Sequence, residues 1–188
     1  MRISDKIMIT TPLSKVTIER LKVGDQVLIS GIIYVARDAA HARLIAALDK
    51  EERLPFDIKG QTIYYMGPSP ARPGQVIGSA GPTTSGRMDT FTPRLLAAGL
   101  KAMIGKGGRS LEVRAAIQKY KAVYFVSTGG AAALIAKTIK KSEMVAYPEL
   151  GAEAILKLTV KDFPALVWND IYGGDLYEKE NPLYRRAR

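Results

Sequence analysis

Three loops of this sequence place a cation beside glycines, small polar residues or the start of an expected helix. The first, YVARDAAH, holds Arg37 at the end of an expected strand and directly before a helix. Unpaired N–H groups at a helix start favour an anion, and a guanidinium can grip a carboxylate with two hydrogen bonds. The alternative is an ordinary ion pair between Arg37 and Asp38 or a surface acid. For this loop taken alone, general propensity favours the ion pair.

The second loop, GSAGPTTSGRMD, spans residues 78–89 and combines hydroxyl groups with a cation. Thr83, Thr84 and Ser85 supply three consecutive hydroxyls, and Arg87 follows four residues after the first of them. Such a set at a turn between a strand and a helix suits an oxyanion or a carboxylate. The alternative is a capping loop whose hydroxyls accept helix N–H groups. The density of glycine, hydroxyl and cation favours binding over capping.

The third loop, MIGKGGRS at residues 103–110, presents Lys106 among glycines. Glycines let the backbone approach a ligand closely, and the lysine adds a point charge. The segment does not have the spacing of a Walker A phosphate loop. Together, Arg37, Arg87 and Lys106 suit a dicarboxylate or a phosphate, but these residues alone do not specify a reaction.

Short apolar segments that alternate with helical ones must hold these loops in place. Asp38 is the expected N-cap of a helix whose apolar face includes Leu44. Strands are expected at residues 27–30 and 32–36 (or one long strand bent at Gly31), 63–66, 76–79, 102–104, 122–126, 144–146, 154–160 and 165–168; further helices are expected at 88–98, 111–120 and 131–138. This order predicts an α/β fold, partly parallel, with a β-rich N-terminal lobe. Residues 1–188 are expected to form a single domain.

The composition excludes several kinds of chemistry. The chain has 188 residues, no cysteine and one histidine, His41. Without cysteine it cannot form a disulfide, a zinc–thiolate site, a cysteine nucleophile or an iron–sulfur cluster held by its own thiolates. A single histidine also argues against a histidine-rich metal site and against a Ser–His–Asp triad.

The charge and the hydropathy favour a basic protein of the cytoplasm. The 28 basic and 18 acidic residues give a formal charge of +10, which attracts anions and polyanions. The basic residues are spread along the chain, apart from a cluster at Arg185, Arg186 and Arg188, and no aromatic residues are interleaved with them as in single-strand readers. A basic surface is therefore the favoured interpretation, followed by an anionic small-molecule substrate and then by nucleic acid. No apolar segment has the length of a signal peptide core or a membrane span.

The segment GPTTSGRMDTFTPRLLAAGLKAMIGKG strongly resembles the signature of the class I, iron–sulfur-dependent fumarate hydratases. VARDAAHARL resembles a second signature of that family, and IYYMGPSPARPGQVIGSAG between them is similar as well. The likeness covers roughly residues 25–138. It corresponds to the C-terminal domain of these enzymes, which is a separate β subunit in the two-subunit forms. The β subunits of L-tartrate dehydratase share the pattern.

The resemblance implies a fold, a reaction and a partner. The fold would be a swivelling β/β/α domain, with a mixed sheet core and helices. The reaction would be the reversible hydration of fumarate to (S)-malate in the tricarboxylic acid cycle. The family's [4Fe-4S] cluster is held by three cysteines of the α subunit, so a cysteine-free chain would need that subunit, in an α2β2 heterotetramer. The alternatives are a β subunit that acts on tartrate or another hydroxy-diacid and, in another class, a non-catalytic basic module that binds nucleic acid.

The resemblance also assigns roles to residues at matched positions. Arg37 would bind one substrate carboxylate, while Arg87 and Lys106 would bind the other. Thr83 would be the base at the substrate's methylene carbon. A threonine hydroxyl is a poor base at neutral pH, so this role requires nearby cations that stabilise its alkoxide or a relay with a carboxylate. The alternative is that an aspartate of the partner subunit accepts the proton. The residues expected behind these contacts are Asp38, His41 and Thr84, with His41 either orienting Arg37 or meeting the partner.

Overall fold

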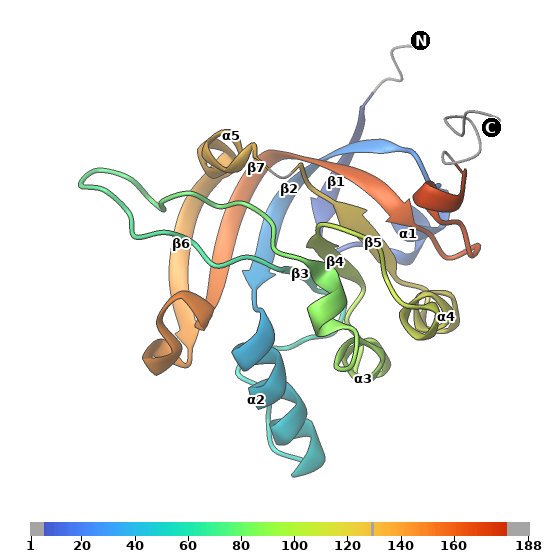
Figure 1. Cartoon of the computed structure of the whole chain (residues 1–188), viewed down its shortest axis with the longest axis horizontal. Coiled ribbons are helices and arrows are strands. Elements are labelled where there is room, and N and C mark those ends of the chain that lie inside the picture. The colour runs from blue at the N-terminus through green and yellow to red at the C-terminus, as the bar shows by residue number, and fades with distance from the viewer. Residues whose placement is uncertain (1–5, 129, 180–188) are drawn as a thin grey trace, which may run out of the picture.

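A computed structural model of the chain describes residues 6–128 and 130–179, in which the strands form one mixed sheet (Figure 1). The strands in chain order are β1 (Ile7–Thr11), β2 (Gln26–Val35), β3 (Thr62–Tyr64), β4 (Ala102–Gly105), β5 (Val123–Val126), β6 (Ile139–Ala146) and β7 (Ile155–Asn169). Their order in the sheet is β1-β2-β3-β4-β5-β7-β6, and β2 also pairs with β7. This extra pairing closes β2, β3, β4, β5 and β7 into a barrel-like ring, with β1 and β6 outside it.

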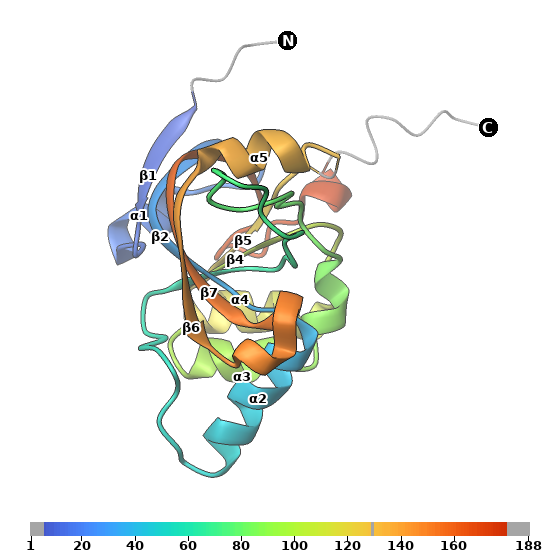
Figure 2. The same ribbon diagram turned by 90° about the vertical axis from the view of Figure 1, so that its left-hand side faces the viewer.

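Helices pack around this ring on two sides. They are α1 (Lys15–Arg20), α2 (Asp38–Asp49), α3 (Thr92–Ala97), α4 (Leu111–Tyr120) and α5 (Ala132–Thr138), with the 3₁₀ helices η1 (Ser85–Met88) and η2 (Pro148–Glu153). Figures 1 and 2 place α2, α3 and α4 at one end of the molecule and α5 at the other. No helix in the described part of the chain is long and apolar enough to cross a membrane.

The central strands are buried on both faces, so their sequences are almost continuously apolar. On β3 and the residue after it, Tyr64 packs into the cluster inside the ring, whereas Ile63 and Tyr65 pack against the helices. On β4, Ile104 faces the ring interior and Met103 faces the helices. Successive side chains of one apolar strand therefore pack alternately into two different cores.

The direction of the strands determines where the loops lie. The pairs β1–β2, β2–β3, β3–β4 and β4–β5 are parallel, whereas β7 runs antiparallel to β2, β5 and β6. Parallel strands end at the same edge of a sheet. The segments that follow β2, β3 and β4 therefore leave the sheet side by side, and they are the three cationic loops.

Several elements agree with the sequence predictions. The helix expected at residues 111–120 is α4 with the same bounds. The strand expected to bend at Gly31 is the single strand β2, whose register against β7 shifts between Ile29 and Gly31. Gly31 has a φ of 112°, and a Cβ there would lie 2.7 Å from the carbonyl oxygen of Thr11. Glycine is required at this bulge by both its backbone angle and its packing.

Other predictions are wrong for identifiable reasons. Residues 76–79 form a loop and not a strand; Ile77 is buried there without a ladder of hydrogen bonds. The strands expected at 154–160 and 165–168 are one strand, β7, which stays paired past Pro164. The N-terminal third does not form a lobe of its own, because β1 and β2 belong to the same sheet as β3 and β4. Neither β1 nor α1 was expected from the sequence.

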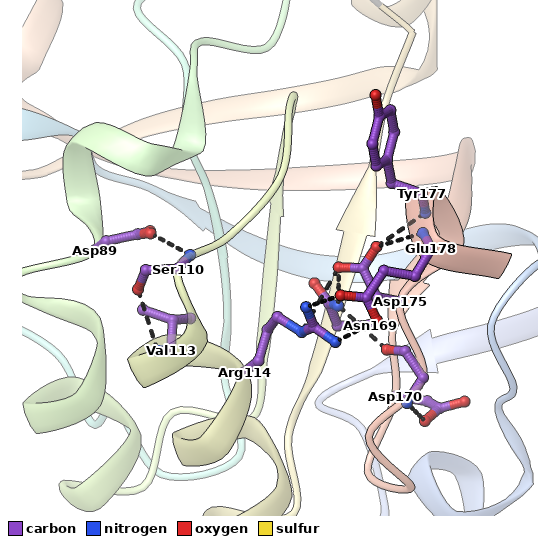
Figure 3. A network of polar contacts seen from close by, with 10 residues as sticks. Asp89, Ser110, Val113, Arg114, Asn169, Asp170, Asp175, Tyr177 and Glu178 are labelled. Atoms are coloured by element: carbon purple, nitrogen blue, oxygen red, sulfur yellow. Dashed lines mark hydrogen bonds and ion pairs between the residues drawn. The ribbon is translucent and has the colours of Figure 1, made fainter. Parts of the chain in front are cut away.

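The segment after β7 is fastened to the rest of the fold by a polar network (Figure 3). Arg114 of α4 donates two hydrogen bonds to Glu178, at 2.6 and 2.9 Å, and lies 3.7 Å from Asp175. The side-chain amide of Asn169 donates to Asp175 at 2.9 Å. Asp170 accepts backbone N–H groups from three residues, including one before β2. Residues 170–179 are thus an integral part of the domain.

Candidate functional site

The loops that follow β3 and β4 are joined to each other by backbone hydrogen bonds. The N–H of Thr83 donates to the carbonyl oxygen of Tyr65 at 2.8 Å. The N–H of Lys106 donates to Thr83 at 3.1 Å, and the N–H of Ser85 donates to Lys106 at 2.9 Å. The hydroxyl-rich loop therefore returns to the carboxyl ends of the strands, and Thr83 sits between β3 and the lysine loop.

Arg87 connects the candidate base to the start of α2. Its Nη2 donates to the hydroxyl oxygen of Thr83 at 3.0 Å and to a carboxylate oxygen of Asp38 at 2.7 Å. Because Thr83 accepts this hydrogen bond, its own proton remains available to another acceptor. The guanidinium also favours the deprotonated form of the hydroxyl. The prediction that Asp38 caps α2 is wrong: Arg37 is the N-cap residue, and Asp38 is the first helical residue and pairs with Arg87.

Arg37 lies beside Gly67, in the loop after β3. A Cβ at Gly67 would lie 2.6 Å from the Cζ of Arg37, so the guanidinium fills the space that a larger residue would need. Its Nη2 is 3.5 Å from Oε1 of Glu153, while its Nε is buried without a hydrogen-bond partner among the described residues. The acid near Arg37 is thus Glu153 and not Asp38, and Arg37 keeps a donor that Glu153 does not satisfy.

His41 supports the backbone of Arg37. Its ring is fully buried, its Nδ1 lies 3.0 Å from the carbonyl oxygen of Arg37, and Tyr65 packs edge-on against it. Burial lowers the pKa of His41 to about 4, so the ring is neutral at pH 7 and its Nδ1–H donates to that carbonyl. Of the two roles expected for His41, the geometry favours orienting Arg37, because the ring offers no surface to a partner.

A third arginine, which the sequence analysis did not single out, lies beneath these loops. The side chain of Arg109 is 0% exposed; its Nε donates to Asp89 and its Nη2 to Thr92, both at 2.7 Å. Its guanidinium also lies 5.4 and 4.9 Å from the ring centres of Tyr65 and Tyr124. Burial by itself lowers the pKa of Arg109, but these aromatic hydroxyls and Asp89 raise it more, which keeps the group charged.

Tyr124 extends this cluster to the lysine loop. Its hydroxyl lies 2.7 Å from the carbonyl oxygen of Gly107, to which it donates, and 2.8 Å from the hydroxyl of Ser85. A Cβ at Gly105 would lie 1.9 Å from the Ser85 oxygen, so glycine is required at the end of β4. The buried side chains of Tyr124, Ser85 and Arg109 thus hold the loops of the site from below.

The remaining predicted residues lie at its surface. The side chains of Thr84 and Lys106 are exposed, and a backbone bridge pairs the two residues. Lys106 joins the loops through its backbone, and its ammonium has no hydrogen-bond or ion-pair partner within residues 6–128 and 130–179. Arg185, Arg186 and Arg188, which formed the basic cluster of the sequence, lie outside the described residues.

The donor set of this chain does not fit an iron–sulfur cluster. The sequence has no cysteine, and within residues 6–128 and 130–179 no three histidine, aspartate or glutamate side chains are grouped to hold a metal ion. What the site offers instead is cationic: Arg87 contacts the hydroxyl of Thr83, and Arg37 and Lys106 lie on the loops at the same edge of the sheet. Such an arrangement can bind an anion with more than one carboxylate and can hold a proton-transfer group between them.

Comparison with known proteins identifies relatives along nearly the whole chain. The family model described as fumarase C-terminus matches residues 2–180. The class I aerobic fumarate hydratase of Salmonella typhimurium is 40% identical over 178 residues, which cover 93% of this chain and 31% of the relative. The putative L(+)-tartrate dehydratase subunit beta of Methanocaldococcus jannaschii is 39% identical over 90% of both chains. The L(+)-tartrate dehydratase subunit beta of Escherichia coli is 32% identical over 97% of this chain and 92% of its own. The chain thus spans about a third of the fumarate hydratases and nearly all of the β subunits.

Proposed function

This chain belongs to the fumarase C-terminus family, and from that premise we propose that it is the β subunit of a two-subunit class I fumarate hydratase. The reaction is the reversible addition of water to fumarate, which gives (S)-malate. The family's named members are hydro-lyases. Coverage of about a third of a fumarate hydratase and nearly all of a tartrate dehydratase β subunit supports a small subunit that completes a larger enzyme.

The observation that carries the proposal is the convergence of Arg37, Thr83, Arg87 and Lys106 at one edge of the sheet. A C4 dicarboxylate carries two negative groups, and each can be held by a cation. Arg37 approaches from the end of β2, while Arg87 and Lys106 approach from the loops after β3 and β4. The hydroxyl of Thr83, which Arg87 contacts, would then face the methylene carbon of a substrate held at both ends.

The role of this chain in the reaction follows from these contacts. Thr83 takes the proton from C3 of malate while hydroxide leaves C2, and returns that proton to C3 when hydroxide adds to fumarate. The Lewis acid that accepts this hydroxide would be supplied by the cluster that an α subunit would hold. The threonine acts as its alkoxide, which Arg87 stabilises through the 3.0 Å hydrogen bond. Asp38 holds Arg87 in place for this purpose. Arg37 and Lys106 bind and orient the carboxylates.

We further propose an obligate partner, since this chain's residues do not fit the [4Fe-4S] cluster that the family resemblance implies. A cysteine-bearing α subunit would hold that cluster and assemble with this chain as an α2β2 heterotetramer in the cytoplasm. Residues 1–188 would act as one domain of the swivelling β/β/α type. The mixed sheet with helices on two sides supports that assignment.

A second candidate is the β subunit of L-tartrate dehydratase or of a related hydro-lyase for hydroxy-diacids. It is favoured by the two tartrate dehydratase β subunits that match this chain over at least 90% of their own length. The same cations would hold tartrate, which is also a C4 dicarboxylate. The comparisons favour either hydro-lyase over the basic nucleic-acid-binding module.

The experiment is an anaerobic assay of fumarate hydration and tartrate dehydration, with this chain alone and with the candidate α subunit. We expect activity only in the mixture, and the preferred substrate separates the two candidates. A mixture that contains an intact cluster, verified spectroscopically, but turns over neither substrate would refute both.

The role of Thr83 has its own test in the active mixture. Replacing Thr83 by Ala should lower kcat by about 100-fold or more, the usual loss for a missing general base. Thr90→Ala is a matched control, because Thr90 is an exposed threonine of the same segment that is assigned no role in the site. If Thr83→Ala stays within about threefold of wild type, the base is another group.

A further inference from the structure

The 3₁₀ helix at the tip of the β6–β7 hairpin reaches the start of α2, where Arg37 lies. Figure 2 shows η2 packed in front of α2. Glu153, the last residue of η2, accepts the backbone N–H of Ala39 through Oε2 at 2.7 Å. Its other oxygen, Oε1, lies 3.5 Å from Nη2 of Arg37. One carboxylate therefore caps the helix and faces the arginine, although it comes from a segment 114 residues away along the chain.

The two contacts of Glu153 differ in strength. The bond to the helix N–H is short, and the partial positive charge at a helix start favours the carboxylate there. The approach to Arg37 is longer than a good charge-assisted hydrogen bond. The side chains of Arg37 and Glu153 are only 24% and 28% exposed, so their charges are less screened than those of surface pairs. Glu153 is thus held by α2 and orients Arg37 without consuming its donors.

This geometry changes the expected anion site at the start of α2. A helix N–H and Arg37 were both expected to be available to a substrate carboxylate, but Glu153 already takes the N–H of Ala39. The buried Nε of Arg37, in contrast, has no partner among the described residues. The N–H of Ala39 is therefore not available to a substrate carboxylate, and Arg37 is the charged group that remains for it at the start of α2.

We propose that Glu153 is a positioning residue that presets the Arg37 guanidinium for a substrate carboxylate, an inference that rests on the proposed dicarboxylate site. Without the charge of Glu153, the guanidinium would still be present but no longer fixed in direction. Arg37 binds a carboxylate that is not the reacting atom, so looser positioning weakens substrate and transition state alike. The change should therefore appear in KM and leave kcat nearly unchanged.

The test compares Glu153→Gln with Glu149→Gln in the active assembly. Glutamine retains an oxygen that accepts the N–H of Ala39, so capping survives while the charge facing Arg37 is lost. Glu149 is the matched control, because it lies in the same η2 and its Oε1 is also 3.5 Å from an arginine of α2, Arg43. We expect Glu153→Gln to raise KM about tenfold with kcat within about twofold, and Glu149→Gln to leave both unchanged.

Three kinetic outcomes would overturn the proposal. If Glu153→Gln lowers KM, then Glu153 competes with the substrate for Arg37 and does not prepare it. If Glu153→Gln leaves KM unchanged, or if Glu149→Gln changes it equally, the loss of charge facing Arg37 has no specific effect.

A measurement on the full chain alone separates this inference from the proposed function. Exchange of the Arg37 Nε–H with water can be followed by NMR in wild type and in Glu153→Gln. We expect exchange to be about tenfold faster in the variant, because an unrestrained guanidinium opens to solvent more often. Equal exchange rates would overturn the positioning role even in an active enzyme. Faster exchange in the variant chain, combined with an assembly that hydrates or dehydrates nothing, would leave positioning intact and refute the proposed function.

Discussion

The ion pair between Arg109 and Asp89 should contribute more to stability than any exposed pair of the site. The guanidinium is 0% exposed, and Asp89 is 15% exposed at a distance of 2.7 Å. The second oxygen of Asp89 accepts the N–H of Ser110 at the start of α4. Asp89→Asn would leave Arg109 charged and buried. Arg109 would then have no carboxylate contact in the described structure. Removing one partner of a buried pair costs about 3–5 kcal/mol.

The expected cost of Asp89→Asn is somewhat smaller than for complete removal of a buried partner. Asparagine still offers one oxygen to Arg109, and Asp89 is partly solvated. We expect the free energy of unfolding to fall by about 2–4 kcal/mol, and the midpoint of thermal unfolding by about 4–16 °C for a chain of this length. Urea and thermal unfolding of the isolated chain measure both quantities.

The control for this prediction is Asp38→Asn, which neutralises a pair with the same 2.7 Å distance. That pair is exposed, at 48% for Arg87 and 38% for Asp38, so its loss should cost less than about 1 kcal/mol. If the two variants lose equal stability, burial does not determine the strength of these pairs and the reasoning fails.

Three further substitutions test the site by other means. The pKa of His41 is about 4 in the folded chain and about 6.5 when unfolded, so its protonation favours unfolding and stability falls as the pH drops from 7 toward 4. Urea unfolding should show a loss of about 2 kcal/mol between pH 7 and 5 that His41→Asn does not show. Gly105→Ala would place a Cβ 1.9 Å from the hydroxyl of Ser85 and should destabilise the chain by about 1–3 kcal/mol in the same assay. Gly67→Ala would displace the guanidinium of Arg37, because the new Cβ would lie 2.6 Å from its Cζ. The KM of the active assembly should rise, while the free energy of unfolding should fall by less than about 1 kcal/mol. An unchanged KM would show that substrate binding does not depend on the position of the Arg37 guanidinium beside Gly67.

The loops after β2 and β4 were predictable because each follows a strand directly, whereas the strand expected just before the loop at residues 78–89 does not form. The local pattern is an apolar segment followed by a glycine or small polar residue, a cation and a helix. Parallel strands bring such patterns to one edge of the sheet. Arg37, Arg87 and Lys106 could therefore be singled out from the residues, while the choice of Thr83 among three hydroxyls came from the family resemblance; the structure brings their loops together. Their roles stay predictions until the variants are measured.

The residues that support these loops could not be identified in the same way. Glu153 reaches Arg37 and Ala39 from the tip of a distant hairpin, and no periodicity relates the two segments. Arg109 lies in the lysine loop itself, but only the fold shows that its side chain turns inward to Asp89. Long-range contacts of this kind depend on how the helices pack on the sheet, which local spacing does not encode.

The errors in the fold have a similar origin. Ile77 is apolar because it covers a core, and a short apolar segment gives the same signal whether it pairs as a strand or packs as a loop. The segment KDFP in β7 suggested a break. Instead, Asp162 adopts a positive φ of 55° and donates its N–H to Ser30, and Pro164 keeps its place opposite Leu28. Pairing with a neighbouring strand can thus continue past residues that would end a strand in isolation.

The position of β6 at the end of the strand order has a consequence for solubility. An outermost strand presents unpaired backbone groups that can recruit another sheet, and proteins counter this with charges and irregular pairing. β6 carries Lys140, Lys141 and Glu143, with an ion pair between the last two, and its register against β7 shifts twice. These features protect the chain from aggregation before any partner binds. Replacing both lysines by valine would give a flat apolar border along which molecules could join edge to edge.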